Sequence, residues 1–202
     1  MRATTVVEAY AARSAEYVER FGQIESAAAD DRRSVLTWAR QYAGPILDVG
    51  CGPGQWTRYL AEHGLSVTGI DPTPEFIAAA RRHHPDGSFR LGSAEHLGAR
   101  DGEVDGVLAW YSLIHTPPEE IDAPLAEFAR CLRPGGGLAI GFFAGEECAP
   151  FDHAVVTAYE WPVELLASRI EAQGFSVTGA QARVESASRT HGFMTARRRP
   201  AQ

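Results

Sequence analysis

The chain contains no lysine, since all nineteen of its basic residues are arginine. Chemistry that forms a Schiff base on a lysine amine, as in pyridoxal enzymes, is therefore excluded. The phosphate-binding P-loop is excluded too, because the lysine of that motif has to reach the phosphates. Any glycine-rich loop in this chain must serve another purpose.

Cysteines and long apolar runs are also scarce. Cys51, Cys131 and Cys148 are too few and too scattered for a disulfide framework or a four-ligand zinc site. No apolar stretch approaches the roughly 18 residues of a membrane span. The N-terminal stretch has acids and tyrosines where a signal peptide needs an apolar core. We expect a cytoplasmic protein with no metal site and no membrane partner.

Positive charge is in deficit as well. The 26 acidic residues exceed the basic ones and give a net charge of −7, which disfavours broad binding to nucleic-acid phosphates. A hydrophobic content of 45% and a charged content of 22% are typical of a folded globular chain. The length of 202 residues is most simply one domain. We expect no nucleic-acid partner, and a monomer or a homodimer.

Strands and helices alternate along the chain. Residues 5–21 and 31–42 have apolar positions at helical spacing, and short apolar runs bounded by glycine or proline then alternate with helical patterns. The last two strands have no helix between them and should form an antiparallel hairpin. The prediction is an α/β, doubly wound fold with a mostly parallel seven-stranded sheet. The predicted strands are 45–50, 65–71, 88–92, 103–111, 135–143, 175–184 and 190–198, and the later helices are 56–64, 74–85, 118–134 and 162–174.

This single domain divides into three predicted parts. Residues 1–42 form an N-terminal helical cap, and residues 43–144 form the core that binds a cofactor. Residues 145–202 supply a lid segment, a helix and the C-terminal antiparallel hairpin.

Three glycines follow the first predicted strand, in the segment ILDVGCGPGQW at residues 46–56. Such a cluster is costly in conformational entropy, so either the chain turns sharply or a ligand approaches the backbone closely. A dinucleotide fingerprint would need a further glycine at position 55 or 57, where Gln55 and Thr57 stand. This spacing disfavours a nicotinamide oxidoreductase.

Two acids flank the glycine cluster. Asp71 ends the second predicted strand, where an acid can bond both hydroxyls of a ribose that lies over the glycine turn. Asp48 precedes the glycines, and its acceptor-only carboxylate suits an ammonium group. A ribose at one end and a cationic amino acid at the other describe S-adenosylmethionine (SAM) better than a pyrophosphate.

Five segments then follow one another in the chain: ILDVGCGPGQW, VTGIDPTPEFIAAAR, RLGSAEHL, EVDGVLAWYSLIH and LRPGGGLAIGFF. In order and spacing over residues 45–144 they resemble the successive motifs of class I (Rossmann-like) SAM-dependent methyltransferases. The resemblance implies S-adenosyl-L-methionine as the cofactor and S-adenosylhomocysteine (SAH) as the product.

The resemblance also implies a role for each matching residue. The three glycines let the backbone pass under the methionine and ribose, Asp48 supports the amino group or the turn, and Asp71 binds the ribose hydroxyls. Many relatives carry aspartate where Ser93 stands, and the backbone of Ala94 can substitute at the adenine edge. The implied cofactor-binding residues are Tyr17, Asp48, Gly50, Cys51, Gly52, Gly54, Trp56, Asp71, Pro72, Thr73, Ser93, Ala94 and Trp110.

Two residues after the fourth strand are candidates for catalysis. His115 is placed to act as a general base, because an imidazole suits proton removal near neutral pH; alternatively, it only shapes the pocket. Tyr111 either orients the acceptor, contacts the methyl group, or is a core aromatic residue. His153 and Tyr159 lie where the acceptor should enter, and we expect them to be structural or exposed. Tyr10 falls where the cap folds over the cofactor in similar enzymes.

The predicted function is methyl transfer from SAM to a small-molecule acceptor, such as a natural-product intermediate of secondary metabolism. No N/D-P-P-Y signature of enzymes that methylate exocyclic or amide nitrogens follows the fourth strand, where WYSLIH stands. The attacking atom is left open among O, N, C and S. The alternative is a protein of the SAM fold that does not methylate: a cyclase, a decarboxylase or a SAM-binding regulator.

Overall fold

Helices and strands alternate over residues 3–184 and 189–200, the parts of the chain that the computed structural model describes. The helices are α1 (Ala3–Ala12), α2 (Ser14–Phe21), α3 (Ala29–Ala39), α4 (Gln55–Glu62), α5 (Pro74–His83), α6 (Asp122–Cys131) and α7 (Val163–Ala172), with a short 3-10 helix at Ile24–Ser26. The strands are β1 (Ile46–Val49), β2 (Val67–Asp71), β3 (Ser88–Leu91), β4 (Val104–Trp110), β5 (Leu132–Ala144), β6 (Ala149–Phe151), β7 (Ala158–Trp161), β8 (Phe175–Val184) and β9 (Thr190–Arg198).

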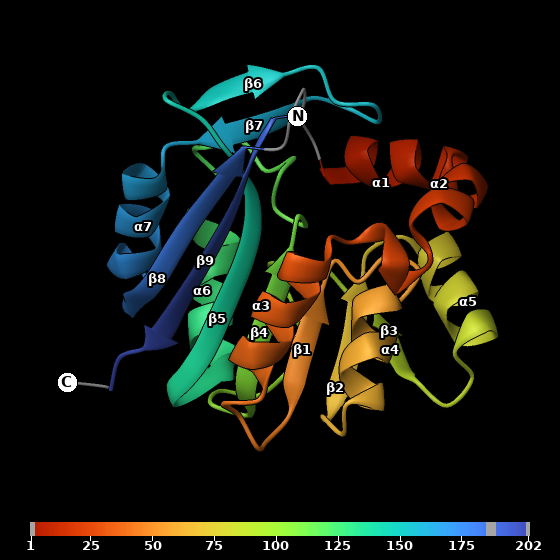
Figure 1. Cartoon of the computed structure of the whole chain (residues 1–202), viewed down its shortest axis with the longest axis horizontal. Helices are drawn as coiled ribbons and strands as arrows, with labels where there is room; N and C mark the ends of the chain where they lie inside the picture. The colour runs from red at the N-terminus through yellow and green to blue at the C-terminus, as the bar shows by residue number, and fades with distance from the viewer. Residues whose placement is uncertain (1–2, 185–188, 201–202) are drawn as a thin grey trace.

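The first five strands form a parallel sheet in the order β3-β2-β1-β4-β5 (Figure 1). β7 joins β5 in parallel and pairs with β6 in the antiparallel sense. β9 runs antiparallel to both β5 and β8, so the predicted C-terminal hairpin is confirmed. The doubly wound α/β fold class is confirmed as well.

The sheet differs from the prediction in the segment after β5. The described residues form nine strands instead of seven, because β6 and β7 lie in the segment predicted as a lid. These strands have only three and four residues, too few for an alternating pattern to be recognised. α6 begins at Asp122, later than predicted, and Pro124 lies in its first turn, where no backbone N–H is needed.

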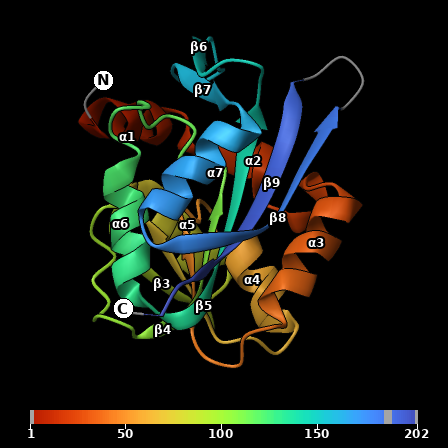
Figure 2. The same cartoon turned by 90° about the vertical axis from the view of Figure 1, so that its left-hand side faces the viewer.

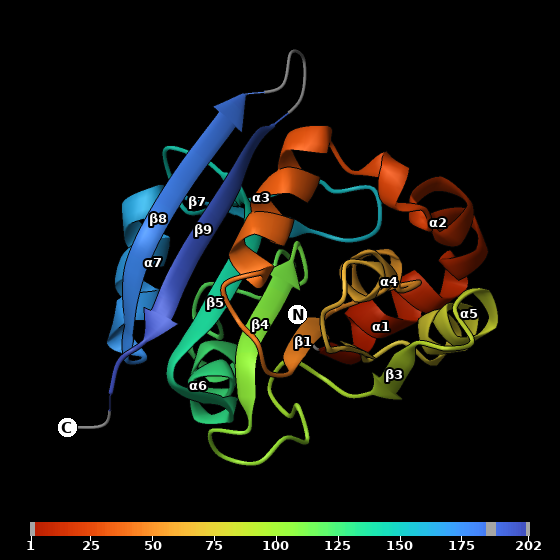
Figure 3. The ribbon, with the colours of Figure 1, turned by 60° about the horizontal axis from the view of Figure 1, so that its bottom comes forward.

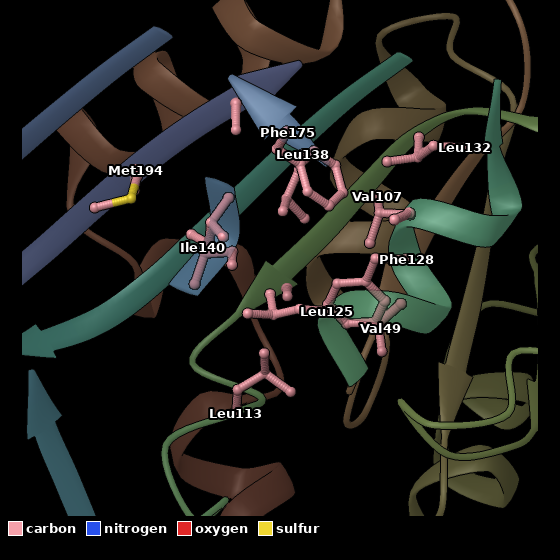
Figure 4. Packing of buried hydrophobic residues seen from close by; sticks show 14 of the residues in the cluster. Val49, Val107, Leu113, Leu125, Phe128, Leu132, Leu138, Ile140, Phe175 and Met194 are labelled. Atoms are coloured by element: carbon pink, nitrogen blue, oxygen red, sulfur yellow. The ribbon is translucent and has the colours of Figure 1, made fainter. Parts of the chain in front are cut away.

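Side chains alternate between two cores, one on each face of the sheet. On β4, Val107 packs with residues of α6 and α7, while its neighbour Leu108 packs with residues of α3 and α4. Figure 2 shows these helix pairs on opposite faces, and Figure 4 shows Leu125 and Phe128 of α6 near Val49 and Val107. Because both faces are covered, only the ends of the parallel strands can present polar groups to a ligand.

Of the predicted cap over residues 1–42, α3 instead packs on one face of the sheet. The name cap is kept below for α1 and α2, two helices where the sequence predicts one over residues 5–21. The helix is interrupted at Arg13, whose guanidinium group donates to the Glu16 carboxylate and to the carbonyl of Ala154. Figure 3 shows α1 and α2 beside α5, far from the hairpin of β8 and β9. The cap therefore lies over the end of the sheet at which the first parallel strands terminate (Figure 1).

Candidate functional site

A cavity of about 710 Å³ opens at the carboxyl ends of β1, β2 and β4, next to the cap. Doubly wound sheets bind ligands at this position, and the volume lies in the range of about 300–1,000 Å³ of ligand pockets. At one end of the cavity, called the glycine end, lie Asp48, Gly50, Gly52 and Asp71. At the other, called the aromatic end, lie Tyr111, Phe143, His153 and His191.

The three glycines of the loop after β1 all have left-handed backbone angles, with φ of 71° at Gly50, 54° at Gly52 and 90° at Gly54. A side chain at Gly50 would place its Cβ 2.2 Å from the Cβ of Ser112, and one at Gly54 would lie 2.7 Å from the ring of Phe89. Close packing therefore requires these two glycines. A Cβ at Gly52 would have only Cε1 of Tyr17 within 4 Å, at a distance of 3.7 Å. The backbone of this glycine is therefore open to the cavity.

Asp71 ties the glycine loop to the end of β2. Its carboxylate is only 5% exposed and accepts the backbone N–H groups of Gly52, at 2.9 Å, and Thr73, at 2.8 Å. Burial raises the pKa of Asp71, while these backbone hydrogen bonds oppose the rise. A carboxylate has about four lone-pair sites, so two remain to accept the hydroxyl groups of a diol.

Asp48 is more deeply buried, with 1% of its surface exposed. Its carboxylate accepts a hydrogen bond of 2.6 Å from the hydroxyl of Thr57. Burial raises the pKa of Asp48 to about 7, against an ordinary value of 3.8. A cationic group nearby would favour the ionised carboxylate again. At the glycine end, Asp71 can accept hydrogen bonds from a diol, Asp48 can pair with a cationic group, and Gly52 offers open backbone. These three features fit the sugar and amino-acid parts of SAM.

Most of the predicted site residues line this one cavity. Three do not: Gly54 faces Phe89 and Ala80, Ser93 forms an isolated bridge with His96, and Ala94 packs against the core. The predicted residues that line it are Tyr17, Asp48, Gly50, Cys51, Gly52, Trp56, Asp71, Pro72, Thr73, Trp110, Tyr111 and His115.

Two tyrosines bring the cap to the cavity. The rings of Tyr10 and Tyr17 are 5.6 Å apart, and Tyr17 lies 5.1 Å from Phe76 of α5. Burial raises the pKa of Tyr17 to about 12 and raises that of Tyr10 further. Both hydroxyl groups therefore stay protonated and can donate hydrogen bonds.

Both ring nitrogens of His115 are engaged. Nδ1 lies 2.8 Å from the carbonyl oxygen of Thr157, which can only accept, so Nδ1 carries the proton. Nε2 then accepts the hydroxyl of Tyr10, also at 2.8 Å. The imidazole is 7% exposed, and burial lowers its pKa to about 4. To take a proton from an acceptor, His115 would first have to lose its bond to the cap.

Tyr111 is the one non-glycine residue in the described ranges with a left-handed backbone, at φ 54°. Such a conformation costs about 1–3 kcal/mol and persists only where the surroundings enforce it. Here the backbone N–H of Tyr111 donates to the carbonyl of Gly141 at 3.0 Å. The hydroxyl of Tyr111 is hydrogen-bonded to Nδ1 of His191.

Sequence reasoning missed Phe143 and His191. They lie opposite each other where β5 and β9 pair, with ring centroids 5.6 Å apart. Nothing local in the sequence marks them, because their proximity depends on an antiparallel pairing between distant segments. His153, in the loop after β6, completes the aromatic end at 5.1 Å from the ring of His115.

Two kinds of feature are absent from residues 3–184 and 189–200. No three side chains of His, Cys, Asp or Glu gather there as a metal site would require. Nor does that part of the chain contain a helix with the length and apolar character of a membrane span.

Comparison with known proteins identifies a methyltransferase domain within the chain. Residues 46–136 match the family described as a methyltransferase domain. An uncharacterized methyltransferase of Mycobacterium tuberculosis is 38% identical over 95 residues, which are 47% of this chain and 38% of that protein. A malonyl-[acyl-carrier protein] O-methyltransferase of Salmonella typhimurium is 34% identical over 127 residues, 63% of this chain and 49% of that protein. The matches thus span less than half of these two relatives.

A solved structure agrees over nearly the whole chain. The 1,6-didemethyltoxoflavin-N1-methyltransferase of Burkholderia thailandensis superposes with a TM-score of 0.78 at 23% identity, covering 99% of this chain and 92% of that one. At this identity the likeness establishes the fold, and the match of residues 46–136 establishes the domain. Residues 46–136 of the chain are therefore a methyltransferase domain, and the whole chain has the fold of this SAM-dependent methyltransferase.

Proposed function

We propose that the chain transfers the methyl group of SAM to a small-molecule acceptor. The observation that carries this proposal is one cavity that joins the glycine end to the aromatic end beside the cap. A methyl donor and an acceptor have to share one space, because displacement at the methyl carbon needs both partners in line.

The glycine end would hold the cofactor. Asp71 would accept the ribose hydroxyls, Asp48 would face the amino group, and the open backbone at Gly52 would allow close approach. When bound, SAM supplies a methyl group already activated by its sulfonium, so the protein's main tasks are alignment and exclusion of water. Tyr10 and Tyr17 of the cap would serve the second task, since both line the cavity and their half-buried rings pack against each other and against Phe76.

The aromatic end would hold the acceptor. Its rings form a continuous wall, with Phe143 centred 5.1 Å from Tyr111 and 6.3 Å from His153. The relatives named above are methyltransferases, which supports methylation over a non-methylating role. We place the acceptor among small metabolites, such as intermediates of secondary metabolism in the cytoplasm.

Calorimetric titration with SAH tests the cofactor half of this proposal. We expect saturable binding to the wild-type chain, and about ten- to a hundredfold weaker binding when Asp71→Ala removes the diol acceptor. Absence of SAH binding to the folded wild-type chain would overturn the proposal. Screening of acceptors with labelled SAM, with detection of SAH and of a product heavier by one methylene, then tests transfer itself.

A further inference from the structure

We propose that Tyr111 and His191 together remove the proton from the acceptor, and that the acceptor is an aromatic ring bearing a phenolic O–H or a ring N–H. This inference rests on the proposed function and assigns the aromatic end its chemistry. It gives His191 a catalytic role that its sequence context does not suggest.

The backbone of Tyr111 is the first observation. Along an extended strand, consecutive side chains point to opposite faces, so Trp110 and Tyr111 should not meet the same space. Both line the cavity. The left-handed backbone at Tyr111 ends the strand and turns this side chain toward the cavity, at a cost in strain.

The neighbouring strand makes room for the rings. A Cβ at Gly141 of β5 would lie 2.9 Å from the indole of Trp110 and 3.1 Å from the ring of Tyr111. Gly141 pairs with Trp110 across the sheet and receives the N–H of Tyr111. The position of the Tyr111 ring is therefore built into two strands.

His191 reaches the same place from β9. Tyr111, Phe143 and His191 form a triangle of rings with centroid distances of 5.1, 5.6 and 5.6 Å. Such a corner favours a flat aromatic partner, which can pack against rings in stacked or edge-on geometry. Nδ1 of His191 lies in hydrogen-bond contact with the hydroxyl of Tyr111, which gives that hydroxyl a route for its proton.

His115 is less suited to the same task. Its Nδ1 donates to Thr157 and its Nε2 accepts from Tyr10, so the imidazole already links the cap to the core. It is also buried, whereas His191 is half-buried and can be solvated when it becomes charged. A tyrosine hydroxyl contacts each of the two histidines, so the difference between them is burial: His191 can be solvated as an imidazolium more readily than His115.

The acceptor proton moves to the hydroxyl oxygen of Tyr111 while the hydroxyl's own proton moves to Nδ1 of His191, which becomes imidazolium. The electron pair released on the acceptor attacks the methyl carbon, and the pair of the broken carbon–sulfur bond stays on sulfur. SAM becomes SAH, and the imidazolium returns its proton to water.

A spectroscopic experiment tests this without turnover. Nitrophenol is added to the chain saturated with SAH, at a pH where the free probe is mostly protonated, and the coloured phenolate is measured. We expect the phenolate-to-phenol ratio of the bound probe to be at least about tenfold higher than in solution. His191→Ala and Tyr111→Phe should remove this gain, while His63→Gln, on the exposed end of α4, should keep it.

His191→Asn separates proton uptake from positioning. The asparagine amide can still accept the hydroxyl of Tyr111 but cannot take its proton at neutral pH. Loss of the phenolate gain in this variant supports the proposal, and a retained gain would reduce His191 to a positioning residue and overturn it. Binding of SAH to each variant, measured by calorimetry, shows that the cavity is intact.

Turnover with two phenols of different acidity gives a second readout. His191→Ala should lower kcat by about 10²–10⁴ with the less acidic phenol and by less with the more acidic one. Equal small losses with both would contradict the inference. Failure of SAH to bind the wild-type chain would instead defeat the proposed function, so the two failures are distinguishable.

Discussion

The two ends of the cavity are built in different ways. At the glycine end, Asp71 is held by backbone N–H groups of its own loop and of the glycine turn, within one βαβ unit. At the aromatic end, Tyr111 follows β4 directly, while Phe143 and His191 come from β5 and β9, and the three touch mainly through their rings. Backbone geometry defines the first end, and the assembly of distant strands defines the second. The glycine end should therefore tolerate few amino-acid substitutions. The aromatic end should tolerate substitutions, and these should alter which acceptor binds.

Substitution in the glycine loop gives the largest expected effect. Gly52→Val should abolish SAH binding, because a β-branched side chain is strained at φ 54° and would fill the open backbone. Gly54→Val is the matched control, since its side chain would strike Phe89 inside the fold. We expect the second variant to lose thermal stability most, and the first to lose calorimetric SAH binding while it stays folded. Retained binding in folded Gly52→Val would mean that the glycine serves only the turn.

The charge of Asp71 gives the next largest effect. Asp71→Asn keeps one oxygen to accept an N–H but loses the charge and the second acceptor oxygen. We expect SAH affinity to fall about tenfold or more, and to fall further in Asp71→Ala. Calorimetry on both variants checks this order. Wild-type affinity in either variant would remove Asp71 from the ribose site.

The buried Asp48 gives a pH-dependent effect on stability. Its pKa rises from 3.8 to about 7 on folding, so the folded state binds the proton more tightly than the unfolded state. The stability conferred by this proton is fully present below pH 3.8 and is lost as pH rises through about 7. The asparagine of Asp48→Asn stays neutral at every pH. The melting temperature of this variant should therefore exceed that of the wild type by an amount that grows as pH rises from 3.8 to about 7. Each kcal/mol corresponds to about 2–4 °C for a chain of this size. A difference that stays constant from pH 4 to 8 would contradict the buried, protonated carboxyl.

The hydrogen bond between cap and core gives the smallest effect. Tyr10→Phe removes the donor to His115 and should cost about 0.5–1.5 kcal/mol of local stability. In the wild type, folding lowers the pKa of His115 from 6.5 to about 4, so the folded state favours the neutral imidazole. The stability that the chain gains from the neutral His115 is fully present above pH 6.5 and is lost as pH falls through about 4. Hydrogen exchange of residues 3–21 checks both statements. Exchange in Tyr10→Phe should be faster than in the wild type at pH 7, and the two should converge near pH 4.

The same difference between the ends explains what could be predicted from the sequence. The glycine end follows from a continuous stretch in which Gly52 and Asp71 stand at the ends of consecutive strands, so local patterns were sufficient to predict it. Even there, the packing reason for Gly54 was not visible, because Phe89 meets it only in the folded chain. The open backbone at Gly52 could not be predicted either, because it depends on which distant side chains leave the space around this glycine empty.

The aromatic end required the fold. Tyr111 could be proposed as a candidate from its position after β4, but its backbone angle could not be predicted. His191 was not found, since its register with Phe143 depends on the pairing of β5 with β9. The engagement of both His115 nitrogens was equally hidden, because the partners Tyr10 and Thr157 are distant in sequence.

The ring of Tyr17 stands close to the open backbone of Gly52, with Cε1 3.7 Å from where a Cβ would be. A cofactor that lies over Gly52 has to displace this ring, and the helix that carries it belongs to the cap. If the cofactor binds there as proposed, its entry and exit require motion of the cap, and such lid motions take microseconds to milliseconds.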